Sequence, residues 1–160
     1  MQATTRLFFR DLYPDDADRL FDIYSDKEAM KYRGSKINNL EDIKLMISNA
    51  ASATPDYLAI RLAVIKKDSL EIIGTILTKY SNANLECTIG YSIGKKYWGK
   101  GYGTEIVKAM IQNLRSENYS IIKAWTHPEN QGSIRILEKT GFQKVFQEES
   151  NVLLFEFRNS

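Results

Sequence analysis

The sequence has very few of the residues that form disulfides and soft-metal sites. Its 160 residues include one cysteine, Cys87, and one histidine, His127. A single cysteine excludes an internal disulfide and is typical of a reducing cytoplasm. No pair of soft ligands has the spacing of a zinc site, so we expect no metal.

A long apolar run and a strong net charge are also missing. No segment stays apolar over the roughly 20 residues that cross a membrane. The N-terminal stretch MQATTRLFFRDLYPDD lacks the apolar centre of a signal peptide. The net charge of +2 gives little support for a nucleic-acid partner. We therefore expect a cytoplasmic protein, monomer or homodimer, that binds neither membranes nor nucleic acids.

The composition is that of one globular domain spanning residues 1–160. Hydrophobic residues make up 43% of the chain and charged residues 26%, which is enough apolar material for a sizeable core. No internal repeat, low-complexity segment or long linker divides the sequence.

The hydrophobic patterns predict the order β-α-α-α-β-β-β-α-β-α-β-β. TTRLFFRDL predicts a first strand, Pro14 opens a helix, and further helices are expected at 27–31 and 41–51. Residues 57–93 predict an antiparallel meander of three strands, because KDS and SNAN suit hairpin turns between apolar runs.

The second half of the chain alternates helices and strands. A helix is predicted from about Gly101 to Glu117, followed by the strand IIKAWT. The segment NQGSIRILEKTGF predicts a helix with an Asn cap and Gly141 as its stop. FQKVFQEE and VLLFEFR predict a closing hairpin. We expect an α+β fold of three layers, with a mixed, mostly antiparallel central sheet of about seven strands and helices on both faces.

The segment YWGKGYGTE, at residues 97–105, places glycines immediately before a predicted helix. The first amides of a helix have no partner within it, and the helix dipole adds partial positive charge there. Glycines remove the Cβ atoms that would keep an anion away, and Lys95, Lys96 and Lys100 add charge. This loop therefore predicts a site for phosphate or pyrophosphate, with a plain glycine-containing connector as the alternative.

Two other phosphate-binding motifs do not match. A P-loop needs GxxxxGK[ST], which is absent. A dinucleotide-binding fingerprint needs GxGxxG in a parallel βαβ unit, whereas the strands before this loop are predicted to be antiparallel.

The segments IGYSIGKKYWGKGYGTEIVKAMI and HPENQGSIRILEKTGF together resemble the GNAT superfamily of N-acetyltransferases. TTRLFFRDLYPDDADRLFDIYSDKEAMKYRG is also similar to the first strand and helices of the branch that contains the ribosomal-protein N-terminal (alanine/serine) acetyltransferases. The resemblance therefore covers nearly the whole chain.

This resemblance implies acetyl-CoA as co-substrate, bound in a V between two central strands. It implies that the strand LECTIGYSI pairs with the pantetheine arm, that the glycine loop binds pyrophosphate, and that Asn130 and Ser133 lie against the cofactor. The implied cofactor-binding residues are Tyr91, Ser92, Ile93, Trp98, Gly99, Lys100, Gly101, Tyr102, Gly103, Thr104, Asn130 and Ser133.

The sequence departs from the family pattern at three positions. Trp98 stands where the family often has Gln or Arg, although the branch that this chain resembles commonly has Trp-Gly there. Leu137 stands where many members have a tyrosine that protonates the leaving thiolate, and leucine has no proton to donate. Thr88 stands where relatives often have a carboxylate directly before Ile-Gly-Tyr. Glu86 lies two residues earlier on the same strand face.

The expected reaction is direct transfer of acetyl to a neutral primary amine. Glu86 is the first candidate for the general base, acting through water, and Ser133 is the second catalytic candidate. Glu28 is a further candidate base, and a solvated charge is the alternative for either glutamate. Cys87 and His127 are more simply explained as packing or polar residues. A helix cap is the alternative for Asn130, where the family position favours a cofactor contact. A structural role in the first helical turn is the alternative for Ser133. The remaining candidates are aromatic residues for an acceptor pocket, with core packing as the alternative: Tyr32, Tyr80 and Trp125.

The acceptor stays open at this point. The branch resemblance favours the N-terminal α-amino group of a protein, such as a ribosomal protein, over a polyamine, an amino acid or an aminoglycoside. A CoA-binding module without catalysis is the alternative that Leu137 and Thr88 suggest, and a nucleotide-binding protein is a third.

Overall fold

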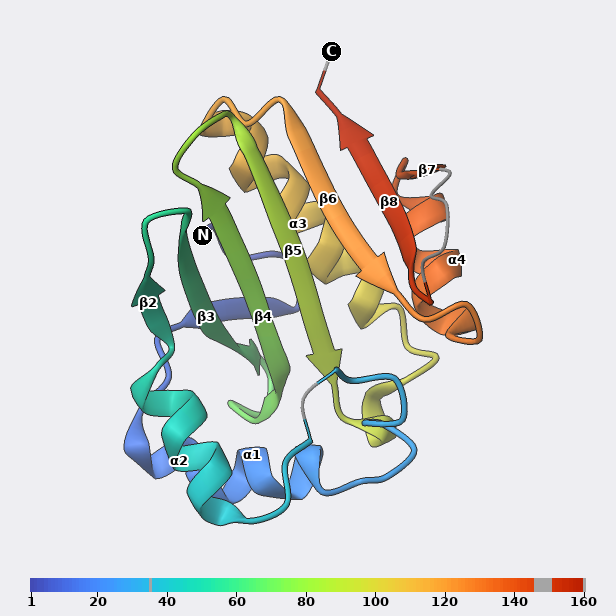
Figure 1. Cartoon of the computed structure of the whole chain (residues 1–160). Helices are drawn as coiled ribbons and strands as arrows, with labels where there is room; N and C mark the ends of the chain where they lie inside the picture. Colours follow the sequence, from blue (N-terminus) through green and yellow to red (C-terminus); the bar gives the residue numbers. More distant parts are fainter. Residues whose placement is uncertain (35, 146–150, 160) are drawn as a thin grey trace.

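The computed structural model describes residues 1–34, 36–145 and 151–159. Figure 1 shows a central twisted sheet with helices on both faces. The strands are β1 (Leu7–Arg10), β2 (Ala51–Ala53), β3 (Tyr57–Lys66), β4 (Ile72–Ser81), β5 (Glu86–Ile93), β6 (Ile121–Thr126), β7 (Gln143–Val145) and β8 (Leu153–Arg158). The helices are α1 (Ala17–Tyr24), α2 (Leu40–Ser48), α3 (Tyr102–Ser116) and α4 (Gln131–Lys139), with 3-10 turns η1 (Pro14–Asp16) and η2 (Lys95–Tyr97).

The sheet has the order β1-β3-β4-β5-β6-β8-β7, and β2 pairs with the edge of β3. The pairs are antiparallel except for β5 and β6, which run parallel. A parallel pair needs a long crossover, and α3 supplies it. The predicted fold class, a mixed and mostly antiparallel sheet with helices on both faces, is confirmed.

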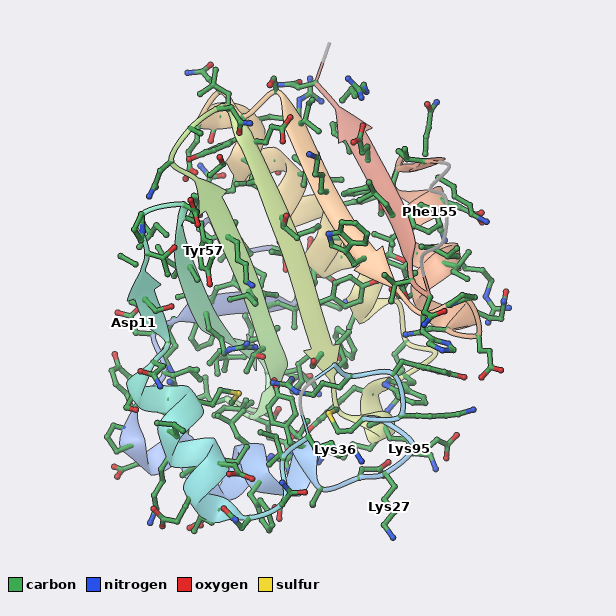
Figure 2. The ribbon with its side chains drawn as sticks, viewed as in Figure 1. Asp11, Lys27, Lys36, Tyr57, Lys95 and Phe155 are labelled. Carbon is green, nitrogen blue, oxygen red and sulfur yellow. The ribbon has the colours of Figure 1, made fainter. Side chains whose placement is uncertain are left out.

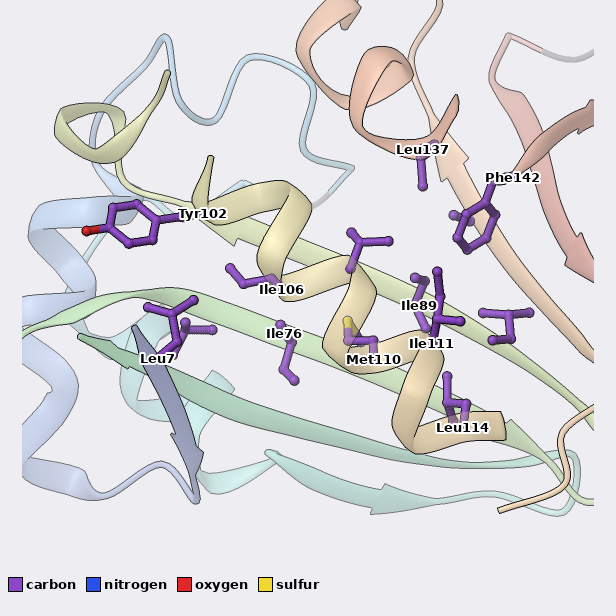
Figure 3. Close-up of a cluster of buried hydrophobic side chains, with 14 of the residues drawn as sticks. Leu7, Ile76, Ile89, Tyr102, Ile106, Met110, Ile111, Leu114, Leu137 and Phe142 are labelled. Atoms are coloured by element: carbon purple, nitrogen blue, oxygen red, sulfur yellow. The ribbon is translucent and has the colours of Figure 1, made fainter. Parts of the chain in front are cut away.

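Each face of the sheet has its own hydrophobic core. On one face, Ile106, Met110 and Leu114 of α3 pack against strand residues that include Ile76 and Ile89 (Figure 3). On the other face, α1 and α2 pack against β3 and β4. The period-2 alternation of β3, β4 and β5 feeds both cores. Within the described residues no helix has both the length and the apolar character to cross a membrane.

Two predicted helices differ from the structure in the first half of the chain, and one strand there was not predicted. Residues 27–31 form turns rather than a helix. The Asp26 carboxylate caps the amides of Glu28 (3.0 Å) and Ala29 (2.8 Å), but the helical bond from Met30 to Asp26 is followed by turns in which Lys31 donates to Glu28 and Arg33 to Met30. The helix expected at 41–51 ends at Ser48. Residues 51–53 instead form β2, an exposed edge strand with no apolar alternation to reveal it, so the sheet has eight strands.

The closing hairpin is described only in part. Of FQKVFQEE, residues 143–145 form β7, which pairs with β8, and residues 146–149 lie outside the described residues. Gly141 ends α4 with φ of 95° and donates its amide to the Glu138 carbonyl at 3.1 Å. The prediction of Gly141 as the helix stop is confirmed.

Gly74 fixes the approach of β4 to β5. A Cβ at this position would lie 2.0 Å from the Ser92 carbonyl oxygen. That oxygen belongs to the backbone of β5, which is held in register with β4, so it cannot shift as a flexible side chain would. We therefore expect Gly74→Ala to destabilise the fold by about 2 kcal/mol or more, which lowers Tm by roughly 4–8 °C. Thermal unfolding followed by circular dichroism measures this change.

Gly34→Ala is the matched control, because a Cβ at Gly34 meets no atom within 4 Å. Equal Tm values for the two variants would contradict the proposed close approach.

Candidate active site

The ladder between β5 and β6 covers only half of β5. Pairing runs from Glu86–Ile121 to Ile89–Ala124 and then stops. On its other edge β5 stays paired with β4 as far as Ile93, and Figure 1 shows β5 and β6 diverging beyond the paired part. In the described chain, no strand pairs with the β6-facing edge of β5 at residues 90–93. We call this unpaired edge of β5 the split. This is the edge at which the pantetheine arm is expected.

The loop between β5 and α3 has the backbone geometry that its glycines allow. Gly99 has φ of 71° and Gly101 φ of 82°, and Gly101 is the N-cap residue of α3. Side-chain-bearing residues adopt these values at a cost, so glycine is favoured at both positions. The space beside Gly99 is open, since a Cβ there would meet no atom within 4 Å. The N-terminus of a 15-residue helix therefore faces an accessible cradle.

The third glycine of the loop has a different use. A Cβ at Gly103 would lie 2.5 Å from Cδ1 of Ile136, so this glycine allows α3 and α4 to approach closely. Gly103 is buried, and so is Tyr102. These two predicted loop residues can offer only backbone amides to an anion.

The loop is anchored by the N-terminal segment, which sequence reasoning missed. The Arg6 guanidinium donates to the Lys100 carbonyl at 2.9 Å, pairs with the Glu105 carboxylate at 2.6 Å, and lies 4.2 Å from the centre of the Tyr102 ring. Burial would raise the pKa of Glu105, but bonds from Thr4 and Arg6 outweigh it and lower that pKa. Arg6 follows the repeated threonines of TTRLFF, and no local pattern links it to residue 105.

The three lysines of the loop differ in their partners. Lys95 pairs with Glu28, and Lys96 with Glu71 at 3.2 Å. Lys100 donates to the Lys96 carbonyl at 2.9 Å and has no carboxylate partner within the described residues. Lys100 is thus the lysine whose charge is not offset locally. Glu28, a candidate base, is tied to Lys95 in this way.

Tyr91 and Ser133 meet behind the split. The Tyr91 hydroxyl and Ser133 Oγ are 2.8 Å apart, joining β5 to the first turn of α4. Burial raises the pKa of Tyr91 to about 12, although the bond with Ser133 opposes the rise. Asn130 caps α4, since its Oδ1 accepts the Ser133 amide at 3.1 Å. The structure therefore brings three of the predicted residues together.

Leu137 belongs to the hydrophobic core. It lies one helical turn after Ser133, is 1% exposed, and packs in the cluster that contains Phe142 (Figure 3). The hydroxyl pair of Tyr91 and Ser133 is thus close along the helix to the position where relatives have tyrosine.

Glu86 lies apart from this group. It is the first residue of β5, in the closed part of the ladder, and its carboxylate pairs with Lys123 at 2.6 Å. Gly90, where the split begins, is four residues away, or about 13 Å along the strand. Glu86 and Thr88 do share a face, as expected, and it is the face opposite to buried Cys87 and Ile89. The structure does not bring Glu86 to the split.

The candidates Cys87, Tyr80 and His127 have mainly structural contacts. Cys87 is 2% exposed, and burial raises the pKa of its thiol to about 12, which disfavours a thiolate nucleophile. Tyr80 packs against Tyr119 at the far end of β4. His127 stacks on Tyr32 with ring centres 5.1 Å apart, and its Nδ1 accepts the Glu129 amide.

The contact between Tyr32 and His127 joins two segments that are far apart in the sequence. Tyr32 comes from the segment linking α1 to α2, and His127 from the loop between β6 and α4. Lys31 and Glu129 add an ion pair of 3.7 Å between the same two segments. Trp125 is 47% exposed on β6. Tyr32 and Trp125 therefore remain candidates for lining the acceptor side.

Two arginines near the split were also missed. Arg61 lies in the middle of β3 and donates to Thr75 Oγ1 at 3.3 Å, and Arg33 donates to Ser92 Oγ at 3.4 Å. A lone arginine inside the apolar run YLAIRLAVI was the available signal. Figure 2 labels Lys27, Lys36 and Lys95 near the end of the sheet where the segment linking α1 to α2 runs. No group of three or more metal-ligating side chains occurs among the described residues.

Comparisons with known proteins agree with this geometry. The family model "Acetyltransferase (GNAT) domain" matches residues 6–143. The uncharacterized N-acetyltransferase p20 of Bacillus licheniformis is 33% identical over 144 residues, covering 88% of this chain and 81% of that protein. The [ribosomal protein uS5]-alanine N-acetyltransferase of Escherichia coli is 37% identical over 82 residues, covering 48% and 41%.

Solved structures show the same fold. A GNAT-family acetyltransferase from Bacillus anthracis superposes with a TM-score of 0.84 at 22% identity, over 98% of this chain and 96% of that one. The spermidine N-acetyltransferase from Vibrio cholerae, in complex with CoA and spermine, gives 0.79 at 14% identity, over 97% and 96%. The chain belongs to the GNAT acetyltransferase family. It is an N-acetyltransferase.

The glycine loop can be tested by placing a negative charge at the start of α3. We expect Gly101→Glu to weaken acetyl-CoA binding at least 100-fold, because the carboxylate repels the pyrophosphate and the residue has φ of 82°. Isothermal titration calorimetry measures the affinity, and circular dichroism checks the fold.

Gln112→Glu adds the same charge to an exposed position of α3, about 15 Å along the helix from its start, and serves as the control. A folded Gly101→Glu variant with normal affinity would remove the loop from the binding site.

Proposed function

We propose that the protein transfers the acetyl group of acetyl-CoA directly to a primary amine, and that this amine is the N-terminal α-amino group of a protein, ribosomal proteins being the first candidates. The observation that carries the use of acetyl-CoA is the split beside a glycine loop at a helix N-terminus. The E. coli relative that acts on ribosomal protein uS5 supports the choice of acceptor.

The described residues fit acetyl-CoA. The open backbone edge of residues 90–93 suits the amides of the pantetheine arm, as an added strand would. The cradle at Gly99 and Gly101, with the amides that begin α3, suits the pyrophosphate. Lys100 adds a charge with no local carboxylate partner in the described chain. When bound, acetyl-CoA supplies a thioester carbonyl that a neutral amine attacks without an acyl-enzyme stage.

An α-amino group requires little help to lose its proton. Its pKa is about 8, compared with about 10.4 for a lysine side chain, so a useful fraction is neutral near pH 7. A strong base in contact with the amine is therefore not required. This suits a site whose two candidate bases are both held in ion pairs, Glu86 by Lys123 and Glu28 by Lys95.

Ser133 is the proposed hydrogen-bond donor to the leaving sulfur, and Tyr91 positions it. The thiol formed has a pKa of about 8.5, so a hydrogen bond from a hydroxyl stabilises the departing thiolate near neutral pH. Tyr91 stays neutral because burial raises its pKa to about 12. Its hydroxyl can therefore fix the Ser133 rotamer over the working pH range.

Two substitutions separate the proposed donor from the other catalytic candidate. We expect Ser133→Ala to lower kcat by at least 10-fold with little change in acetyl-CoA affinity, since loss of one hydrogen-bond donor to a developing negative charge typically costs about 10²–10³ in kcat. We expect Glu86→Gln to change kcat less than about 3-fold, because Glu86 is about 13 Å from the split along β5. Stopped assays of free thiol provide both values.

The pH profile adds a check on Tyr91. A neutral tyrosine with pKa of about 12 causes no loss of rate below about pH 11, so the wild-type rate should not fall between pH 8 and 10. The outcomes of the two substitutions are distinct. A large loss of kcat in Glu86→Gln would restore Glu86 to the mechanism, and full activity of Ser133→Ala would remove Ser133 from it.

The acceptor class is tested by thiol release across a panel. Peptides beginning with Ser, Ala, Met and Thr are compared with spermidine and an aminoglycoside. We expect turnover with at least one peptide class and kcat/KM at least 10-fold above that of spermidine. A preference for spermidine, which the structural likeness to the V. cholerae enzyme makes a specific alternative, would overturn the N-terminal assignment.

A further inference from the structure

Two arginines meet on the face of the sheet that α1 and α2 cover. Arg61 donates to Thr75 Oγ1 at 3.3 Å, and Arg33 donates to Ser92 Oγ at 3.4 Å. Thr75 and Ser92 are direct partners in the register of β4 and β5, so their Cα atoms are about 4.5–5.5 Å apart. The two guanidinium groups therefore contact neighbouring hydroxyls.

Tyr24 forms the wall of this site. Its ring centre is 4.4 Å from the guanidinium carbon of Arg33, and its hydroxyl is hydrogen-bonded to Thr75 Oγ1. Tyr24 is 2% exposed, and Thr75 is fully buried. Both arginines are thus held by packed, ordered groups rather than extending freely into solvent.

Within the part of the chain that the structure describes, Arg61 is a partly buried cation without a counter-ion. No carboxylate among the described residues lies within 4 Å of it. Burial lowers the pKa of Arg61, and the charge of Arg33 lowers it further, yet an arginine stays protonated in proteins. A buried charge with no counter-ion is destabilising, and a second cation beside it adds repulsion. Binding of an anion would therefore lower the free energy of the folded protein at this site.

The place of the arginines relates them to the acceptor. Ser92 belongs to the split, and its side chain lies on the face opposite to that of Tyr91, which contacts Ser133. An acceptor that approaches the split from the α1 and α2 side therefore passes the two guanidinium groups. Guanidinium is suited to carboxylates because its N–H groups match two carboxylate oxygens.

We propose that Arg33 and Arg61 form a carboxylate-binding subsite, so that the preferred acceptor carries a carboxylate close to its reactive amine. The carboxylate is either the α-carboxylate of a free amino acid or an acidic side chain near a peptide N-terminus. This inference rests on the proposed acetyl transfer to a primary amine, and a free amino acid as the source would replace the protein N-terminus as the acceptor. The subsite also disfavours polyamines and aminoglycosides, whose positive charges the two arginines repel.

Matched acceptors test the subsite and separate the two sources. One arm compares peptide amides that begin Ala-Asp and Ala-Asn, and the other compares alanine with alaninamide, with rates corrected to the neutral amine. We expect kcat/KM to be at least 10-fold higher for the acid in one of the two pairs. The pair that shows the preference identifies the source of the carboxylate.

Arg61→Met distinguishes a binding role from a structural one. Methionine has a similar reach and no charge, so we expect the preference for the acid to disappear while acetyl-CoA affinity is kept and Tm is unchanged or higher. Arg115→Gln removes a charge from the exposed last turn of α3 and is the control. Equal rates for acid and amide in both arms, or a preference that survives Arg61→Met, would overturn the proposal.

A binding measurement keeps the subsite testable if the wild-type protein releases no thiol with any acceptor. That outcome would reject the proposed function. Calorimetry with N-acetylalanine and N-acetylalaninamide, in the presence of CoA, then judges the subsite separately. We expect binding of the acid only, lost in Arg61→Met, and equal binding of both compounds or of neither would reject the subsite.

Discussion

The parting of β5 and β6 is the constraint from which the rest of the site follows. Each strand is held by its outer neighbour past the point where they separate, β5 by β4 to Ile93 and β6 by β8 to Thr126. Because the outer ladders stay intact, the inner edges can be left open without unfolding the sheet. An edge of unpaired backbone groups is usually covered or blunted in proteins. Here it borders the glycine loop and the start of α4, where a thioester ligand can pair with it.

The two faces of β5 carry different parts of the proposed site. One face carries Tyr91, which meets Ser133 of α4 on the side of α3. The other carries Ser92, which contacts Arg33 on the side of α1 and α2. Since side chains alternate along a strand, consecutive residues separate the leaving-group side from the acceptor side. The proposed hydrogen-bond donor to the leaving sulfur and the proposed acceptor subsite are then independent in structure, which allows one to change while the other is kept.

Glycines serve three separate purposes in this arrangement. Gly101 provides a left-handed backbone at the start of α3, Gly103 lets α3 approach Ile136, and Gly74 lets β4 approach the Ser92 carbonyl. Only the first concerns the anion directly. The close approaches at Gly103 and Gly74 fix the positions of α4 and β5, and hence the distance between the Tyr91 and Ser133 hydroxyls. A motif of alternate glycines thus combines binding with packing.

Local sequence determined the helices, the meander, the glycine loop with its helix N-terminus, and the caps at Asn130 and Gly141, because periodicity and backbone preferences act over a few residues. The family resemblance also assigned Tyr91 and Ser133 to one site. The sequence did not reveal β2, whose three residues are exposed, or the turns at 27–31, where one capped helical turn is followed by tighter turns.

Tertiary structure alone decided which side chains share the site. It placed Glu86 in an ion pair away from the split, tied Arg6 to Glu105, and brought Arg33 and Arg61 to adjacent hydroxyls. These contacts join residues that are 14 to 99 positions apart in the chain. The register of the sheet and the path of the crossover decide which of these distant residues meet. Neither can be predicted from the pattern of a single segment.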